Sequence, residues 1–263
     1  MKNLFILIFL VAGMTTLQAQ IKIGKMKIDT KKAIQAGKDA AGAITLSDED
    51  IASMSKEYMQ WMDTHNKLAA PDSELGKRLA KITANFPEIE DLKLNFGVYE
   101  VVDVNAFACG DGSIRVCAGL MELMTDDEVL AVIGHEIGHV VHHDSKNAMK
   151  NAYLRSAAKN AAGALNENVS KLTDSQLGDL AEAFMGAQFS QKQENAADDY
   201  AFDFCIRQNV DPYAMSKALN KLVELSAAGG EKANLIQKMF SSHPGSAERA
   251  ARLKEKADNL QKK

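Results

Sequence analysis

The stretch that decides the fold is AVIGHEIGHVVHHDS, residues 131–145, which gathers four of the chain's six histidines around one glutamate. A helix is expected to carry it, because Thr125 and Glu128 have the spacing of a capping box at a helix start. Apolar residues follow at helical intervals and give this helix a buried side. His135 and His139 are four residues apart, so they share one face of the helix and both imidazoles can reach a single ion.

This pattern is typical of a zinc site, whereas the alternative is that the histidines are ordinary core or surface groups. Two imidazoles at this spacing present nitrogen ligands without distorting the backbone. Glu136 projects about 100° away around the helix, where it can act on a water instead of binding the metal. A metzincin would need glycine at position 142 and a histidine at 145, but the chain has His142 and Ser145. A third ligand is therefore expected further along the chain.

Carboxylates downstream are the candidates for this third ligand. In FSQKQENAADDYAFDFC, residues 189–205, Glu194 and Asp198 are one helical turn apart, and alanines beside them would let two helices approach closely. Two carboxylates at this spacing repel each other unless a cation is near. Glu194 as ligand, with Asp198 accepting a hydrogen bond from a ligand histidine, would give the outer support that metal sites usually have. On spacing alone, Glu182 and Asp174 remain alternatives to Glu194.

The remaining sequence predicts a mainly helical α+β fold with one small antiparallel sheet before the histidine helix. Residues 92–117 are rich in β-branched and aromatic residues and contain the turn signal Gly110-Asp111-Gly112. A helix is expected after Ser47, which is a suitable N-cap, and helices are expected to fill the chain after Leu120. Breaks in this helical part are predicted near Gly163, Asp174, Asp211-Pro212, Gly229-Gly230 and His243-Pro244.

The N-terminus has the pattern of a secretory signal, with Lys2, an apolar run over residues 4–14 and a small-residue cleavage site ending at Ala19. We expect a signal peptide at 1–19, a flexible lysine-rich linker at 20–45 and one catalytic-sized domain at 46–263. The apolar run is shorter than the roughly 20 residues that span a bilayer, and no later run is long enough. Export to the periplasm or cell envelope is therefore expected. An uncleaved signal anchor and a peripheral membrane contact through the lysines remain alternatives.

Charge and cysteine content narrow the classes of partner. The formal net charge of -4 gives no reason to expect the basic face that nucleic acid requires. Cys109, Cys117 and Cys205 are an odd number of cysteines, so a disulfide framework is not indicated. Whether Cys109 and Cys117 pair is left open by the sequence.

Two motifs taken together, HEIGH at 135–139 and ENAAD at 194–198, resemble a family of HEXXH zinc metallopeptidases. It is the family of the CAAX prenyl endopeptidase, HtpX, Oma-type, BepA and LoiP proteases, and the chain is similar to its soluble exported branch. The segments NAFACGDGSIRVCAGL at 105–120 and SHPGSAER at 242–249 also resemble the family. The resemblance covers about residues 47–260 and implies a gluzincin-type zincin fold.

The resemblance also implies site residues and a cofactor. It implies one zinc ion per chain, bound by His135, His139 and Glu194. The motif's catalytic glutamate falls on Glu136 and its aspartate on Asp198. The family often has Pro-Gly-Gly at the strand turn where this chain has residues 110–112, so the shape of the substrate edge does not carry over.

The expected function is zinc-dependent endoproteolysis of exported or envelope proteins, including unfolded or misfolded ones in quality control. The alternative is a zinc-containing envelope chaperone or peptide-binding protein with little proteolysis. Either function takes protein or peptide partners. The strand that includes Asn105, Ala106, Phe107 and Ala108 is expected to pair with an extended substrate by strand addition.

His243 has two interpretations. Pro244 discourages helix at the residue before it, so the imidazole is presented from a loop. In one interpretation, which the resemblance suggests, His243 reaches the open side of the metal and either caps it at rest or stabilises the oxyanion during turnover. In the other, it belongs to a helix cap or surface turn, and Arg249 pairs with a nearby acid.

Overall fold

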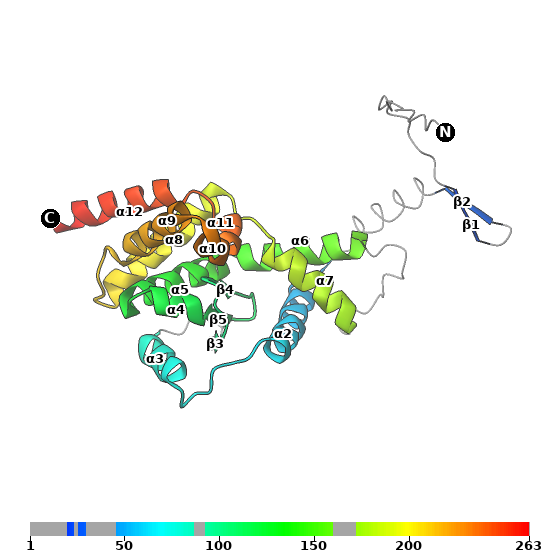
Figure 1. The fold of residues 1–263 in the computed structure, drawn as a ribbon, viewed down its shortest axis with the longest axis horizontal. Coiled ribbons are helices and arrows are strands. Elements are labelled where there is room, and N and C mark those ends of the chain that lie inside the picture. Colours follow the sequence, from blue (N-terminus) through cyan, green and yellow to red (C-terminus); the bar gives the residue numbers. More distant parts are fainter. Residues whose placement is uncertain (1–19, 24–25, 30–45, 87–92, 160–171, 263) are drawn as a thin grey trace, which may run out of the picture.

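The computed structural model describes residues 20–23, 26–29, 46–86, 93–159 and 172–262, and Figure 1 shows their arrangement. The strands are β1 (Gln20–Ile23), β2 (Met26–Asp29), β3 (Asn95–Tyr99), β4 (Ala106–Ala108) and β5 (Ser113–Cys117). The helices are α2 (Asp48–His65), α3 (Glu74–Thr83), α4 (Ala118–Leu123), α5 (Asp126–Val141), α6 (Asp144–Lys159), α7 (Asp174–Met185), α8 (Gln191–Arg207), α9 (Ala214–Ala228), α10 (Gly230–Leu235), α11 (Gln237–Ser242) and α12 (Ser246–Gln261). The predicted mainly helical α+β class is confirmed.

Three of the strands form a mixed sheet in the order β3-β5-β4. The turn at residues 110–112 joins β4 to β5 as an antiparallel hairpin, as its glycines predicted. β3, however, pairs with β5 in parallel. The prediction of an antiparallel sheet was therefore wrong in this pair. The chain between β3 and β4 does not form a tight turn, so β5 can enter between the two strands in the same direction as β3.

The sheet lies between two hydrophobic cores. One face supplies Ala106, Ala108 and Ile114 to a core shared with α5, α8, α9 and α12. Tyr99 and Phe107 belong instead to a second core with α2, α6 and α7. In Figure 1 these two groups of helices occupy opposite sides of the molecule. The sheet thus supports the histidine helix α5 on one side and α2 on the other.

α5 and α8 pack at very short range because glycines face alanines between them. A Cβ atom placed on Gly138 would lie 2.9 Å from the Cα of Ala197, which is closer than real Cβ contacts allow. A Cβ on Gly134 would lie 3.4 Å from the Cα of Ala201. The close approach expected from the alanines of residues 189–205 is therefore present. It brings the first turns of α8 directly against the two histidines of α5.

Most of the predicted helix breaks occur in the structure. Asp174 begins α7, residues 208–213 separate α8 from α9, Gly229 separates α9 from α10, and His243 to Gly245 separate α11 from α12. Gly163 lies outside the described residues. The structure also breaks the chain between α5 and α6, where His143 has a φ of 60°. The sequence did not predict this break, because neither glycine nor proline marks it.

Two predictions from the N-terminal sequence, the signal peptide and the linker, concern segments that lie wholly or partly outside the described residues. The predicted signal peptide at 1–19 does so entirely. Within the segment expected to be a linker, β1 and β2 pair as an antiparallel hairpin in which Ile21 faces Ile28. The sequence there alternates lysine with isoleucine or methionine, which is a strand pattern that the lysine content obscured. Across the described part of the chain, no helix has both the length and the apolar character needed to cross a bilayer.

Candidate metal centre

α5 presents His135 and His139 to one buried point. The helix begins at the predicted capping box, in which the backbone N–H of Thr125 donates to the Glu128 carboxylate and the N–H of Glu128 donates to the Thr125 hydroxyl. His135 and His139 are only 2% and 0% exposed. Their Nε2 atoms lie 3.1 Å apart. Two imidazole nitrogens that converge in this way can bind the same ion.

α8 brings Glu194 against both histidines. The helix starts at a capping box between Ser190 and Gln193, which places Glu194 in the first turn. One carboxylate oxygen of Glu194 lies 3.3 Å from Nε2 of His139, and the other lies 3.5 Å from Nε2 of His135. The side chain is fully buried. Glu194 therefore completes a set of two nitrogen donors and one carboxylate.

The other candidates for the third ligand lie elsewhere. Asp174 is at the start of α7, where it accepts a hydrogen bond of 2.7 Å from the indole N–H of Trp61. Glu182 is exposed on the same helix. Neither residue belongs to the buried cluster of donors. The geometry therefore selects Glu194 from the three alternatives that spacing left open.

Two further carboxylates contact the outer nitrogens of the histidines. Nδ1 of His135 lies 3.0 Å from a carboxylate oxygen of Asp198. Nδ1 of His139 lies 3.1 Å from a carboxylate oxygen of Asp144, whose other oxygen accepts a hydrogen bond of 2.6 Å from Gln193. A proton on each Nδ1 would donate to these carboxylates and leave each Nε2 lone pair directed at the cluster. Asp198 thus has the contact expected of it, and Asp144 is a second such residue.

Arg249 of α12 binds the carboxylates of α8 from behind. Its guanidinium donates two hydrogen bonds to Asp198, of 2.9 and 2.6 Å, and a further nitrogen contacts Glu194. Arg249 is only 1% exposed. Burial alone would raise the pKa of Asp198, but hydrogen bonds from Arg249 and His135 hold that pKa well below its ordinary value. The predicted pairing of Arg249 with an acid is present, and it is part of the site.

The electrostatic surroundings of His135 favour its positively charged form. Burial would lower the pKa of His135, but hydrogen bonds with Asp198 and Glu194 raise it to about 9. Burial would raise the pKa of Glu194, and its contacts with the three histidines hold it far below the ordinary value. A divalent cation bound among these groups would satisfy the same preference.

His243 joins the cluster from the end of α11. Its Nδ1 lies 3.0 Å from Glu194 and 3.3 Å from Nε2 of His135. The residue is 7% exposed and its imidazole is turned inward. The interpretation in which His243 reaches the site therefore agrees with the geometry. The interpretation as a surface turn does not, although His243 does follow the last residue of α11.

Glu136 lies beside the donor cluster without joining it. It is 2% exposed, and its Oε1 has no hydrogen-bond partner among the described residues. That oxygen lies 3.6 Å from Nε2 of His243. Burial raises the pKa of Glu136 above its ordinary value. A buried carboxylate with a free oxygen is suited to receive a proton from a group that enters the site.

The residues present suit a metal ion. One donor atom from each of His135, His139, Glu194 and His243 can be chosen so that all four lie within 4.8 Å of one another. All four residues are buried. Imidazole nitrogens and carboxylate oxygens are the donors that transition-metal sites use, and both α5 histidines have the outer carboxylates that fix a ligand's orientation. We conclude that this cluster is a metal-ion site.

Three contributors to the site were not identified from the sequence. Asp144 follows His139 by five residues, a spacing that would not share a face if the helix continued, and the unpredicted break after α5 brings it back. Gln193, which donates to Asp144, was not singled out in the sequence. Phe189 stacks on the imidazole of His139 with ring centroids 4.0 Å apart, and nothing in its sequence context indicates this. His142 is exposed at the end of α5 and lies outside the cluster.

β4 is an edge strand, as the predicted substrate strand requires. The hydrogen bonds that flank β4 run between Asn105 and Cys117 and between Cys109 and Ser113. In an antiparallel pair, residues that hydrogen-bond to the partner strand alternate with residues that do not. The backbone N–H and C=O groups of Ala106 and Ala108 therefore point away from β5. No further strand pairs with this edge in the described chain. Both alanines are nevertheless almost fully covered, at 1% and 3% exposed, so the edge is closed in this structure.

The cysteines form no disulfide. Cys109, Cys117 and Cys205 are all buried, and none of them is part of a disulfide. The Sγ of Cys109 instead contacts the sulfur of Met59 at 3.4 Å. The question that the sequence left open for Cys109 and Cys117 is thereby answered for this structure.

The sequence is similar to a family of peptidases and to several named metalloproteases. The family model described as Peptidase family M48 matches residues 69–257. The chain is 39% identical to Metalloprotease YcaL of Escherichia coli (strain K12) over 87% of its own length and 88% of the relative's. It is 38% identical to Metalloprotease LoiP of the same organism, over 90% and 92% of the two chains. Protease HtpX of Alkalilimnicola ehrlichii is 34% identical over a shorter region, 35% of this chain and 32% of the relative. These matches confirm the resemblance that the two motifs indicated.

Proposed function

The chain belongs to peptidase family M48 and is a metalloendopeptidase, and from this premise we propose that it is a one-zinc enzyme that cleaves unfolded or misfolded proteins of the cell envelope. His135, His139 and Glu194 bind the zinc, and Glu136 is the general base. The observation that carries the proposal is the buried convergence of these three donors beside a carboxylate oxygen that has no hydrogen-bond partner among the described residues.

The donor set supports zinc over other metals. Two imidazoles and one carboxylate are the protein ligands of several catalytic zinc sites, which keep a further position for water or substrate. Harder ions such as magnesium and calcium prefer sites made of oxygen alone. A zinc ion here would polarise the scissile carbonyl and make a water acidic enough to lose a proton near neutral pH.

Glu136 performs the proton transfers in this proposal. Its free oxygen accepts a proton from the attacking water and then delivers it to the nitrogen of the leaving amine. The raised pKa of this buried carboxyl suits both halves of the task, because the group must gain and release a proton in one cycle. Asp198 and Asp144 hold the imidazoles in the orientation that binding requires, and Arg249 fixes Asp198 and Glu194.

His243 is proposed to cap the site at rest. Its Nδ1 lies within hydrogen-bond distance of Glu194 and close to Nε2 of His135, so it competes for the space that a substrate carbonyl would need. The residue follows the short helix α11 and lies two residues before Gly245, which has a φ of 78°. A segment of this kind can move away without unfolding a long helix. Displacement of His243 would open the site.

The substrates are proposed to be extended polypeptide segments. The outward backbone groups of Ala106 and Ala108 would pair with such a segment once the edge is uncovered, which favours accessible backbone over a particular sequence.

The proposal that the protein is exported rests on the signal pattern of residues 1–19. Fractionation of cells that express the whole chain tests this part, with a mature protein starting at Gln20 in the envelope fraction as the expected result. A protein retained with residue 1 in the cytoplasm would contradict it.

The test of the function uses one substrate protein in two forms. Native and reduced, alkylated samples of a disulfide-containing protein are incubated with the purified chain, with its chelator-stripped form, and with that form after zinc is restored. We expect the unfolded form to be cut at least about tenfold faster, and only when zinc is present. Equal cleavage of both forms would refute the unfolded-substrate proposal.

The same samples also separate the enzyme from its alternative. Their zinc content and their binding of the unfolded substrate are measured beside cleavage. A chain that holds zinc and binds the unfolded form without cutting it would support the chaperone or peptide-binding alternative instead.

A further inference from the structure

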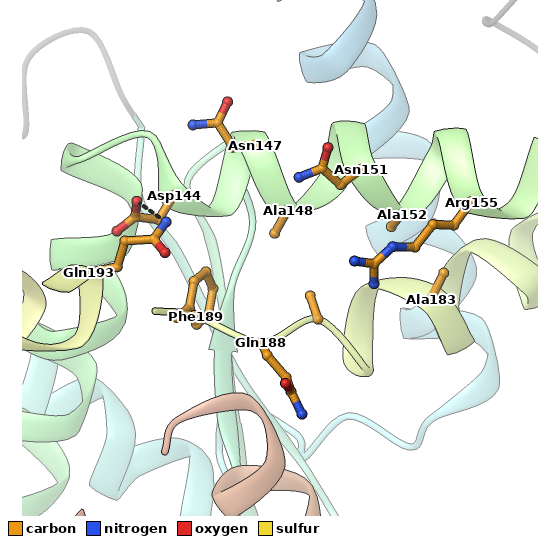
Figure 2. Close-up of a pocket in the computed structure, with 11 residues that line it drawn as sticks. Asp144, Asn147, Ala148, Asn151, Ala152, Arg155, Ala183, Gln188, Phe189 and Gln193 are labelled. Atoms are coloured by element: carbon orange, nitrogen blue, oxygen red, sulfur yellow. Dashed lines mark hydrogen bonds between the residues drawn. The ribbon is translucent and has the colours of Figure 1, made fainter. Parts of the chain in front are cut away.

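A polar groove runs along α6 and ends at Asp144 and Phe189, which both contact His139 of the donor cluster. Figure 2 shows it between α6 and the segment that joins α7 to α8. Its cavity measures about 120 Å³, and small alanines from α6 and α7 form part of its lining. This is about four times the volume that one water occupies in the liquid, so the cavity can accept a side chain or a short stretch of backbone.

Two residues at the inner end connect the groove with the site. Asp144 lines the groove and accepts from Nδ1 of His139, while Phe189 lines it and stacks on the same imidazole. The backbone N–H of Phe189 also donates to the carbonyl of Ser242, the residue before His243. The inner end of the groove is therefore one side chain away from His139, a residue of the donor cluster.

The walls carry polar side chains that are not used within the described chain. Asn147, Asn151 and Arg155 follow at intervals of four residues, so they form one row along α6. Gln188 lies across from them in Figure 2. All four residues are exposed, and the described residues show no side-chain hydrogen bond or ion pair for any of them. Amide side chains both donate and accept, which matches the alternating groups of a peptide backbone.

Arg155 gives the groove a positive end. The two charged residues in its lining are Asp144 at the metal end and Arg155 at the far end. Asp144 is already engaged by His139 and Gln193. The guanidinium of Arg155 points back toward the groove in Figure 2. A guanidinium offers paired donors that match the two oxygens of a carboxylate.

We propose that this groove binds the polypeptide substrate on one side of the scissile bond, and that Arg155 selects a carboxylate in that segment. The proposal rests on the proposed endopeptidase function. Arg155 is eleven residues beyond Asp144 on α6, which is roughly 16 Å along a helix. An extended peptide covers about 3.3 Å per residue, so the carboxylate lies about four to six residues from the cleaved bond.

The experiment compares Arg155→Gln with the matched control Lys150→Gln. Lys150 is on the same helix, but it lies near Asp48 of α2 and does not line the groove. Both variants therefore lose one positive charge, and only Arg155→Gln loses it from the groove. Each enzyme digests a set of synthetic peptides that differ by a glutamate or glutamine at successive positions from the scissile bond. We expect the wild type to prefer glutamate by about three- to tenfold at one position four to six residues away. Arg155→Gln should abolish that preference, and Lys150→Gln should keep it.

Binding to a non-cleaving enzyme separates this inference from the proposed function. The Glu136→Gln variant, alone and combined with Arg155→Gln, is titrated with fluorescent peptides carrying glutamate or glutamine at the same positions. Weaker binding of the glutamate peptide in the double variant supports the groove even if no cleavage is found. Preferences that are the same with and without Arg155 would overturn it, whether or not the chain is an active peptidase.

Peptides with free and amidated C-termini identify the source of the carboxylate. If Arg155 recognises an internal acidic side chain, amidation leaves the preference unchanged. If amidation removes the preference, the bound group is the chain terminus, and the proposal narrows to substrates cut near their C-terminal end. The variant Arg155→Glu reverses the charge at this position. If it loses the preference for glutamate peptides and favours lysine peptides instead, this would further support a direct charge contact.

Discussion

Two buried arginines organise two different polar networks in this protein. Arg115 of β5 is 4% exposed and donates two hydrogen bonds to Asp63 of α2, of 2.9 and 2.8 Å. The remaining guanidinium nitrogen donates to Asn95, and Tyr99 donates to the same aspartate. Arg249 makes the same paired contact with Asp198, but beyond that aspartate lie further carboxylates and three imidazoles.

The difference between these networks distinguishes a structural role from a functional one. The Arg115 network joins α2 to the sheet, and each of its charged groups has a partner. In the cluster beyond Arg249, Oε1 of Glu136 has no hydrogen-bond partner among the described residues, and the Nε2 atoms of His135 and His139 lie 3.1 Å apart. Buried ionisable groups arranged in this way are costly unless another charge completes them. We infer that a metal ion supplies the completing charge in the second network.

The sharpest test of this comparison removes the proposed carboxylate ligand. Glu194→Ala should lower zinc affinity by more than about 100-fold, exceeding the loss seen when a residue outside the ligand set is changed. Glu182→Ala, which changes an exposed glutamate on α7, should leave zinc content unchanged. Zinc content after dialysis against a weak chelator measures both variants. Equal retention in the two would show that Glu194 is not a ligand.

The outer carboxylates should have an intermediate effect. Asp198→Ala removes the partner of Nδ1 of His135 and leaves Arg249 buried without its main acceptor. Zinc affinity or turnover should fall by roughly 10–100-fold. Competition with a coloured chelator gives the affinity, and Asp199→Ala, on the same helix but outside the donor cluster, is the control. An Asp198→Ala protein that matches the control would assign Asp198 to packing alone.

His243 has no counterpart in the Arg115 network, and its removal should act in the opposite direction. If it caps the site at rest, His243→Ala should keep zinc and digest unfolded protein several-fold faster, since a competing group has gone. The initial rate of digestion and the metal content of the same sample are the readouts. A fall of about 10²–10³-fold with zinc retained would instead indicate oxyanion stabilisation. Unchanged rate and metal content would argue against both roles.

The Arg115 network should affect stability and little else. Arg115→Met leaves Asp63 without its cation and should lower the free energy of unfolding by about 2–4 kcal/mol, toward the low end because Asp63 is partly exposed. Zinc content and turnover per folded molecule should stay within about twofold. Urea unfolding at several pH values measures the stability. A loss of zinc in this variant would remove the distinction between the two networks.

The same measurement has a pH dependence whose sign follows from Asp63. Burial would raise the pKa of this aspartate, but hydrogen bonds from Arg115 and Tyr99 lower it below the ordinary value. A group whose pKa is lowered on folding stabilises the protein above its unfolded pKa of about 3.9 and loses that effect as the pH falls through the folded value. The gap between wild type and Arg115→Met should therefore be full near neutral pH and narrow below about pH 4.

The sequence identified the part of the site that is local and left open the part that depends on folding. Thr125, Glu128 and the two histidines of α5 are linked by short spacings, so the helix, its start and its paired donors could all be predicted. Glu194 could not be separated from Glu182 by spacing, because only the packing of α8 against Gly134 and Gly138 decides which carboxylate arrives. The resemblance of two motifs made that choice instead.

Non-local pairings account for what the sequence missed. The parallel pairing of β3 with β5 depends on the path of the intervening chain, which no turn signal describes. Asp144 reaches His139 because the chain breaks at His143, whose positive φ is uncommon for a residue other than glycine. Arg249 was expected to pair with some acid, yet only the fold shows that this acid also contacts a histidine.

In the proposed site three residues hold the metal and Glu136 performs the proton transfers, and the variant Glu136→Gln separates these two roles. Glu136→Gln keeps the size of the side chain and removes its ability to accept a proton, so zinc should stay at one ion per chain while turnover falls by at least about 10²–10⁴-fold. Zinc content and digestion of unfolded casein are measured on the same sample, beside wild type. A Glu136→Gln protein that cleaves casein at the wild-type rate, or that loses its zinc, would show that Glu136 does not have this role.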